Sequence, residues 1–247
     1  MLRLLSIEII KLKKNRQFLI LTIILILSFF GLNYIVSEIF TKEAANILHI
    51  SRWNAVAFIN GFSFTIPAMI IIMHTCSEYT YRTGRQNIID GLTRKQYVAT
   101  KFVMVVALAL FTTILVFLFA FIFGIFSNIE FNFEALKYIV YYFIQSLVYL
   151  VLAFTLALFL KRAILSLSIF IVYSLIIDNY LDSKFNKIIG GLLPLSSCDH
   201  LIPMPFSGGI EWLNYSSKPE YVYLIFTCIY LCLFCFACFY RYEKQDL

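Results

Sequence analysis

FVMVVALALFTTILVFLFAFIFGIF, the sequence of residues 102–126, contains no charged side chain. A helix needs roughly 20 apolar residues to cross the hydrocarbon core of a bilayer, so this run is long enough to span it with some tilt. Further apolar runs cover residues 18–36, 55–76, 136–160, 163–177 and 221–240. We therefore expect an all-α polytopic membrane protein with six transmembrane helices.

The composition supports a membrane protein with one domain. Of the 247 residues, 61% are hydrophobic and 14% are charged, whereas soluble domains are about half apolar and a quarter charged. Six spans and their connections use up the chain, so we expect a single transmembrane domain over residues 1–247 and no second soluble domain. The net charge of +6 does not indicate a nucleic-acid partner, because the Lys and Arg residues flank apolar runs.

The distribution of the 20 Lys and Arg residues predicts the orientation. Only six fall on one side of the six expected spans: Lys42, Arg52, Lys137, Lys184, Lys187 and Lys218. The other fourteen fall on the side that holds both termini, which the positive-inside rule makes cytoplasmic. Lys161 and Arg162 are expected in a cytoplasmic turn, because two cations at a helix centre would cost roughly 5–7 kcal/mol.

Two terminal or connecting segments carry further expectations. Residues 1–16 place Leu2, Leu5, Ile9 and Leu12 on one face, which fits either a helix lying along the inner membrane surface or a plain charged flank. The run at 18–36 is too long for a cleaved secretory signal and is kept as the first span. The external loop at 178–220 is too long for a simple connection, and short interfacial or re-entrant helices are favoured there.

No pattern in the sequence indicates catalysis, a cofactor or a metal. The chain has no H-E-x-x-H, no G-x-S-x-G and no G-x-x-x-x-G-K-[ST], so it is not expected to be an enzyme or to bind ATP itself. The four cysteines between 228 and 238 are read as packing residues, and a Cys198–Asp199–His200 metal site lacks a fourth ligand. His74 is expected to be a helix-end histidine bonded to a neighbour. Charges are scarce inside the expected spans, which disfavours an ion-coupled carrier.

The cytoplasmic segment between the second and third spans has the composition of a protein-binding loop. Thr83 is a candidate helix start and Gly91 a helix stop. Between them an apolar group is flanked by charged and polar residues on other faces: the apolar group is Ile88, Ile89 and Leu92, and the flanking residues are Arg85, Asn87 and Asp90. Such a helix can dock on a soluble partner. The alternative is a solvated loop whose cations anchor it at lipid headgroups.

The same segment resembles the permeases of the ABC-2 transporter superfamily. The pattern consists of Glu78, Thr83-Gly84, Ile88-Ile89, Arg94 and Lys101, and the run RQNIIDG at 85–91 is similar to that of permeases from Bacteroidota-type bacteria. Arg85 departs from the commoner small residue after the glycine. The resemblance implies that the 82–96 segment inserts into a separate ABC ATP-binding subunit, that a second permease chain completes the transporter, and that the protein lies in a bacterial cytoplasmic (inner) membrane.

The resemblance also suggests a role for each residue of the coupling segment. Glu78 and Arg82 would hold the coupling helix to the second span, with Thr83 and Gly84 at its start. Ile88, Ile89 and Leu92 would fill the partner's pocket, and Arg85, Asp90 and Arg94 would set the orientation. Export is the expected direction. Two alternatives stay open: a membrane scaffold that recruits a soluble protein without transport, and a lipid-modifying intramembrane enzyme.

Overall fold

A computed structural model of the chain describes residues 16–39, 52–81, 83, 86, 93–127, 136–185, 190–204 and 218–243. The elements in this part are helical: α2 (Arg16–Ile39), α4 (Arg52–Gly61), η1 (Phe62–Phe64), α5 (Thr65–Thr80), α7 (Arg94–Ser127), α8 (Lys137–Leu160), α9 (Ala163–Val172), η3 (Tyr173–Ile177), α10 (Asp178–Lys184), α11 (Ser196–Asp199) and α12 (Glu220–Glu243). No strand occurs among these residues.

Six helical units are long and apolar enough to cross a membrane. Two of them are composite, since α4, η1 and α5 follow one another without a break, as do α9, η3 and α10. The expected all-α class with six such helices is therefore confirmed, and the chain has the architecture of a multi-pass membrane protein. Lys161 and Arg162, the cations of the expected turn, lie between α8 and α9.

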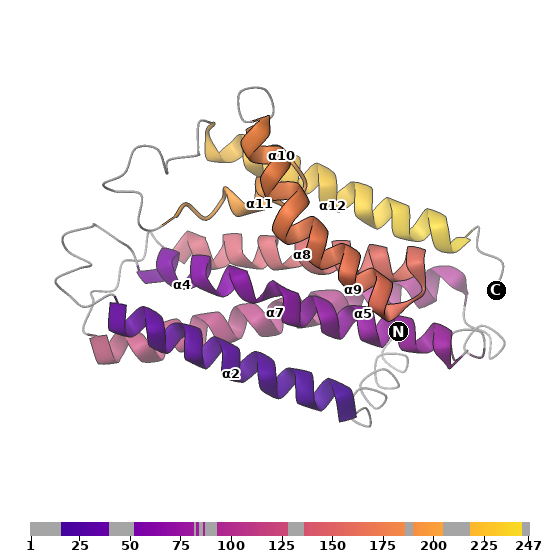
Figure 1. The fold of residues 1–247 in the computed structure, drawn as a ribbon, viewed down its shortest axis with the longest axis horizontal. Helices are drawn as coiled ribbons and strands as arrows, with labels where there is room; N and C mark the ends of the chain where they lie inside the picture. Colours follow the sequence, from indigo (N-terminus) through magenta and orange to yellow (C-terminus); the bar gives the residue numbers. More distant parts are fainter. Residues whose placement is uncertain are drawn as a thin grey trace.

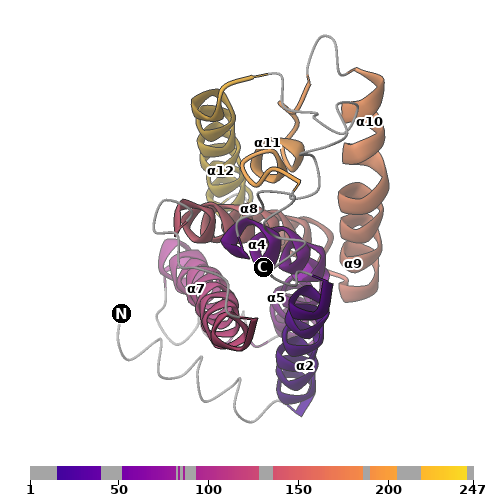
Figure 2. The same ribbon diagram turned by 90° about the vertical axis from the view of Figure 1, so that its left-hand side faces the viewer.

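Helix α8 is the centre of the bundle (Figures 1 and 2). It packs against α4, α5 and α7 on one side and against α9 and α12 on the other. Helix α2 covers the first group, where it contacts α4, α5 and α7. The short helix α11 lies among α8, α10 and α12. The last residues of α5 and the first residues of α7 lie at one end of the bundle, which we call the 81–93 end, and α11 lies toward the opposite end, which we call the 185–218 end (Figure 1).

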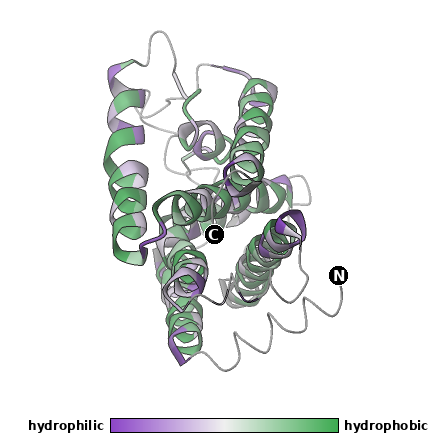
Figure 3. Ribbon diagram, turned by 90° about the vertical axis from the view of Figure 1, so that its right-hand side faces the viewer, coloured by the Kyte–Doolittle hydropathy of each residue, from purple (hydrophilic) through white to green (hydrophobic). Residues whose placement is uncertain are grey.

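The outward faces of the bundle are apolar (Figure 3). On α12, large side chains one or two turns apart stand more than 45% exposed, namely Ile225, Ile229, Leu233 and Phe236. Contiguous apolar surface on this scale is not found on monomeric soluble proteins. Exposing this apolar surface to water would be unfavourable, and contact with lipid tails or with other apolar helices avoids that cost. Hydropathy alone therefore identifies the spans.

The third helix begins earlier than its apolar run. Arg94, Lys95 and Gln96 already belong to α7, although they were assigned to the 82–96 segment. Thr93 and Gln96 form a capping box: the Gln96 N–H donates to Thr93 Oγ1 at 3.3 Å, and the Thr93 N–H donates to Gln96 Oε1 at 3.1 Å. These two bonds satisfy donors that a helix N-terminus leaves free, so the helix extends through a charged sequence.

The fifth helix continues to Lys184, past its expected end at residue 177. Asp178 is only 1% exposed and accepts hydrogen bonds from the backbone N–H and the hydroxyl of Ser196. Asp182 accepts a bond from the Gly191 N–H. The expected loop at 178–220 thus begins with a helix whose carboxylates bind the returning chain, because internal donors replace the water that such residues otherwise require.

Residues 190–204 fold back onto the bundle and are not a free external loop. Leu195, Cys198, Leu201 and Ile202 are buried, and Tyr230 on α12 donates a hydrogen bond to the Leu192 carbonyl at 2.9 Å. Helix α11 therefore closes the bundle at the 185–218 end. The expectation of a surface helix at residues 1–16 lies outside the described residues, except for Arg16 at the start of α2.

Candidate functional site

A buried ion pair joins the second and third spans near the 81–93 end. Glu78 lies in the last turn of α5, and Lys101 lies two turns into α7. The Lys101 Nζ is 2.9 Å from Glu78 Oε1, and the two side chains are 2% and 5% exposed. At this burial water cannot solvate either charge, so each depends on the other.

Two further side chains are in polar contact with this pair. The Tyr97 hydroxyl donates a hydrogen bond to Glu78 Oε2. The Lys101 Nζ is 3.1 Å from His74 Nε2. An ammonium group can only donate, so Nε2 of His74 is the acceptor in this contact. We call Glu78, Lys101, Tyr97 and His74 the charge junction.

The charge junction also reaches the sixth span. Tyr97 stacks on Tyr242 of α12 with ring centroids 4.8 Å apart and an interplanar angle of 12°. The Lys101 Nζ lies 5.6 Å from the centroid of the Tyr97 ring, within cation–π distance. Three helices, α5, α7 and α12, thus meet around one buried ion pair at the end of the bundle where the predicted coupling segment leaves and returns.

The energetics of the charge junction favour a rigid connection. A buried ion pair contributes little net stability relative to apolar residues, but removing one partner typically costs about 3–5 kcal/mol because it leaves a buried charge uncompensated. Separating α5 from α7 would have the same effect as removing a partner. The two ends of the 81–93 connection are therefore held at a fixed spacing.

Only part of the predicted coupling set lies in the described residues. Glu78 pairs with Lys101, and its predicted role with Arg82 in holding the coupling helix stays a prediction, because Arg82 lies outside the described residues. Thr83 is helical and partly exposed, and Arg94 is the first residue of α7. The rest of the set lies outside the described residues: Arg82, Gly84, Arg85, Ile88, Ile89, Asp90 and Leu92.

Sequence reasoning missed the roles of Tyr97, Tyr242 and His74 in this site. His74 has a neighbour as expected, but that neighbour is a lysine on another helix, 27 residues away. A signal was present, since a histidine four residues before a glutamate places both on one face of α5. Within the described residues, no group of three His, Cys, Asp or Glu side chains could hold a metal ion.

Comparison with known proteins places the chain in a family. The family described as "Protein of unknown function (DUF2705)" matches residues 18–247. The match covers all helices of the bundle except the first two residues of α2, and the chain belongs to this family. No curated protein matches the chain.

Proposed function

We propose that this member of the DUF2705 family is the membrane-spanning permease subunit of an ATP-driven ABC transporter, with export as its direction. A separate ATP-binding subunit engages the 82–96 segment, and a second permease chain, identical or homologous, completes the translocation path. The protein works in a bacterial cytoplasmic membrane. The proposal is supported by the six apolar helices, the sequence pattern from Glu78 to Lys101 and the geometry of the charge junction.

The charge junction is the observation that carries this proposal. A segment that transmits force from a soluble motor needs ends that do not yield when it is pushed. Glu78 at one end of the 81–93 connection is bonded to Tyr97 and Lys101 at the other end. The stacked Tyr97 and Tyr242 rings extend the link to α12. A push on the segment would therefore tilt three helices together, as a rigid-body transition requires.

The motor has to be a second protein. The chain has no G-x-x-x-x-G-K-[ST] loop with which to cradle phosphates, so ATP is bound and hydrolysed by the partner. The apolar faces of α2 and α12 offer surface for lipid and for a second permease chain. In this proposal the chain itself takes no cofactor and catalyses no reaction.

Purification from the native membrane tests the proposal. The tagged chain is isolated in mild detergent, and stoichiometric companions are identified by mass spectrometry. We expect a companion with a phosphate-binding loop whose ATP hydrolysis depends on this chain. The double substitution Ile88→Asp and Ile89→Asp should remove it, because two carboxylates cannot enter an apolar pocket. The matched control, Ile88→Val and Ile89→Val, should retain it.

The identification of other companion proteins would support other functions. A soluble partner without a nucleotide site would favour the scaffold, and a chain that is active on lipid without any ATPase would favour the enzyme. Either outcome would remove the transporter proposal. Retention of the ATPase by the Asp variant would remove the role of the 82–96 segment.

A further inference from the structure

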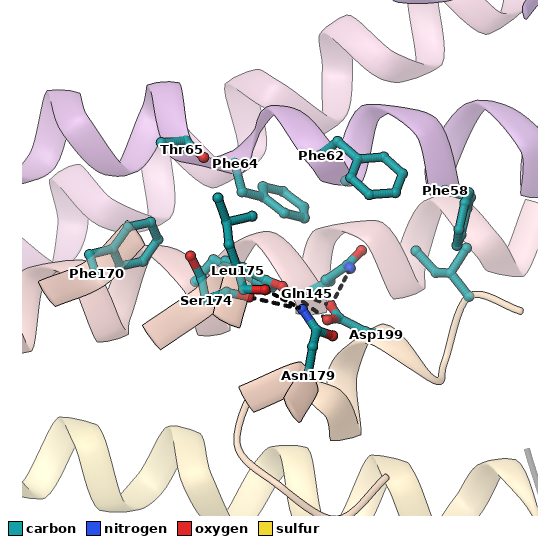
Figure 4. Close-up of a pocket in the computed structure, with 13 residues that line it drawn as sticks. Phe58, Phe62, Phe64, Thr65, Gln145, Phe170, Ser174, Leu175, Asn179 and Asp199 are labelled. Atoms are coloured by element: carbon teal, nitrogen blue, oxygen red, sulfur yellow. Dashed lines mark hydrogen bonds between the residues drawn. The ribbon is translucent and has the colours of Figure 1, made fainter. Parts of the chain in front are cut away.

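A cavity of about 230 Å³ lies between the second and fifth spans near the 185–218 end. Its walls come from α4, η1, α5, α8, α9, η3, α10 and α11 and from Ile202 after α11 (Figure 4). Five of its 13 lining residues are aromatic, namely Phe58, Phe62, Phe64, Tyr149 and Phe170. Phe62 and Leu175, which are 71% and 58% exposed, lie where the cavity meets the surface. An apolar body can therefore enter from the side of the bundle.

One carboxylate lies in this aromatic cavity without a cation. Asp199 accepts hydrogen bonds from Gln145 Nε2 at 2.7 Å and from the Tyr149 hydroxyl at 3.0 Å. Both donors are neutral. Among the described residues no Lys, Arg or His lies within ion-pair distance of Asp199, although the ion pairs of Glu78, Asp182 and Glu220 are present there. A buried carboxylate that lacks a countercharge is costly unless a cation is supplied.

A second acceptor in the same cavity has no donor. Gln145 is 7% exposed, and its Oε1 has no hydrogen-bond partner in the described part of the chain. The orientation of the amide is set by Asp199, because only the Nε2 side can donate to a carboxylate. The site therefore offers two acceptors, Asp199 and the Gln145 carbonyl, and needs a ligand that brings donors.

Both helices that flank the cavity depart from α-helical geometry at this level. The second span forms the 3₁₀ turn η1 at Phe62–Phe64, and the fifth span forms the π-helical segment η3 at Tyr173–Ile177. Phe62, Phe64, Ser174 and Leu175 from these two segments line the cavity. Short π-helical segments often occur at functional sites. The two irregular segments make room where regular helices would pack closely.

We propose that this cavity binds an organic cation, a protonated amine attached to an apolar group. The ammonium is held by Asp199 and the Gln145 carbonyl, and the apolar group lies among the phenyl rings, whose faces attract a cation. The volume is below the roughly 300–1,000 Å³ of typical ligand pockets, so the ligand is small or only its head enters. The ammonium can come from a free amine or from the ethanolamine headgroup of a phospholipid.

The surroundings of the Asp199 carboxylate are consistent with a binding site for a cation. Asp199 is partly open to the cavity, but the surrounding rings separate it from bulk water. Burial is the largest influence on its carboxyl pKa, which is raised to about 7, with Asp178 acting in the same direction and the bonds from Gln145 and Tyr149 opposing. A bound cation would stabilise the ionised form and lower this pKa. Desolvation disfavours the ionised Asp199 carboxylate when no cation is bound. The same poorly solvated surroundings strengthen its attraction to a cation that binds.

The test measures binding to the full chain, without any partner, in lipid nanodiscs. The probes are 2-phenylethylamine and its neutral analogue 2-phenylethanol, titrated by calorimetry. We expect the amine to bind at least about tenfold more tightly than the alcohol, as for a charge-assisted hydrogen bond. Asp199→Asn should weaken amine binding about tenfold and leave alcohol binding unchanged. Glu220→Gln, which removes an exposed carboxylate of the same bundle end, should leave both unchanged.

A second variant protects the test from a folding defect in Asp199→Asn. Gly61 lines the cavity in helical conformation, and a Cβ built on it would lie 3.5 Å from Gln145 Nε2, an ordinary contact. Gly61→Leu should therefore fold, fill the cavity and abolish binding of the amine with the carboxylate still present. Elution as a single species in gel filtration checks that each variant is folded.

Two lipid compositions distinguish the sources of the ammonium. Nanodiscs of phosphatidylglycerol are compared with nanodiscs that contain phosphatidylethanolamine, and each Kd is divided by that of Asp199→Asn in the same disc to cancel surface charge. A larger ratio in the presence of phosphatidylethanolamine, which means that the headgroup competes with the amine for Asp199, assigns the site to the lipid headgroup, and an equal ratio assigns it to a free amine. Equal affinities for amine and alcohol, no saturable amine binding in phosphatidylglycerol discs, or full binding by both variants would overturn the proposal. None of these outcomes depends on the ATP-driven transporter being correct.

Discussion

Two carboxylates at opposite ends of the bundle, the buried Glu78 and the partly buried Asp199, have partners of different charge. Glu78 at the 81–93 end has a lysine at 2.9 Å and a tyrosine hydroxyl on the same carboxylate. Asp199 at the 185–218 end has neutral partners among the described residues, namely the Gln145 amide, the Tyr149 hydroxyl and the Cys198 thiol. Both carboxylates lie near aromatic side chains of other helices. The difference, within the described part of the chain, is a cation beside Glu78 and none beside Asp199.

This difference separates a structural role from a binding role. The Glu78 carboxylate is neutralised within the fold, so a third charged group would gain nothing there, and its contribution is to hold helices together. Asp199 accepts hydrogen bonds but has no cation beside it among the described residues. A cation from outside would therefore be strongly attracted to this preformed acceptor, because the site has a low dielectric constant. Asp178 is an intermediate case, because backbone N–H groups and a serine hydroxyl supply its donors and the returning chain covers it.

The largest expected effect is at the charge junction. Lys101→Met leaves Glu78 buried without its cation, so we expect a loss of about 3–5 kcal/mol in the free energy of unfolding. The double variant Lys101→Met and Glu78→Gln removes both charges and should recover most of this loss. Unfolding of the detergent-solubilised protein, followed by circular dichroism, measures the two single variants, Lys101→Met and Glu78→Gln, and the double variant against the wild-type chain.

The double variant is the decisive control for the charge junction. If the two single effects simply add, the ion pair is not a coupled unit, and the contrast with Asp199 would disappear. The corresponding change at the other end, Asp199→Asn, should cost much less, because no charged partner is left behind.

An intermediate effect is expected from pH at the cavity. The groups that face Asp199 are Gln145 and Tyr149 from α8, Cys198 from α11 and Asp178 from α10. Its pKa of about 7 means that the carboxylate is protonated when the pH falls below that value. Affinity for 2-phenylethylamine, which stays protonated throughout, should therefore fall on the order of tenfold between about pH 8 and about pH 5.5.

The variant Asp199→Asn supplies the reference for this pH profile. Its amine affinity should be low and flat over the same range. A profile in the wild-type chain that is equally flat would show that Asp199 does not carry the cation, whatever the cavity binds.

The smallest effect is expected at an exposed pair. Lys137 and Glu220 lie 2.9 Å apart but are 44% and 53% exposed. Water solvates both charges when either is lost, so Lys137→Met should change the free energy of unfolding by less than about 1 kcal/mol. The same unfolding measurement compares it with Lys101→Met. An effect of equal size at both lysines would mean that burial is not the property that distinguishes the two pairs.

The spans were predictable because hydropathy measures the preference of side chains for an apolar environment, and a bilayer core admits segments by that preference. The boundaries were less predictable where polar residues are satisfied inside the protein. Asp178 and Asp182 have the composition of a loop, yet they belong to a spanning helix because backbone donors from 191, 195 and 196 reach them. Arg94 and Lys95 likewise belong to α7 because Thr93 and Gln96 cap it.

The sequence pattern contained two members of the charge junction, but it did not indicate their pairing or the roles of Tyr97, His74 and Tyr242. Glu78 and Lys101 both belong to the sequence pattern at 78–101, but nothing in the sequence shows that they contact each other. Gln145 and Tyr149 of the cavity lie within one long apolar run, where single polar residues are common. Their partner Asp199 is 54 and 50 residues away. Contacts at such a distance along the chain cannot be predicted from local patterns.

Composition and the lengths of the apolar runs were sufficient to establish a six-helix membrane protein, because a backbone in lipid has to satisfy its own hydrogen bonds and a helix is the simplest way to do so. They could not show which buried charges are compensated. That property depends on which faces of distant helices pack together and on where the chain returns after α10. An acid outside the expected apolar runs therefore became part of an ion pair at Glu78 and an open acceptor at Asp199.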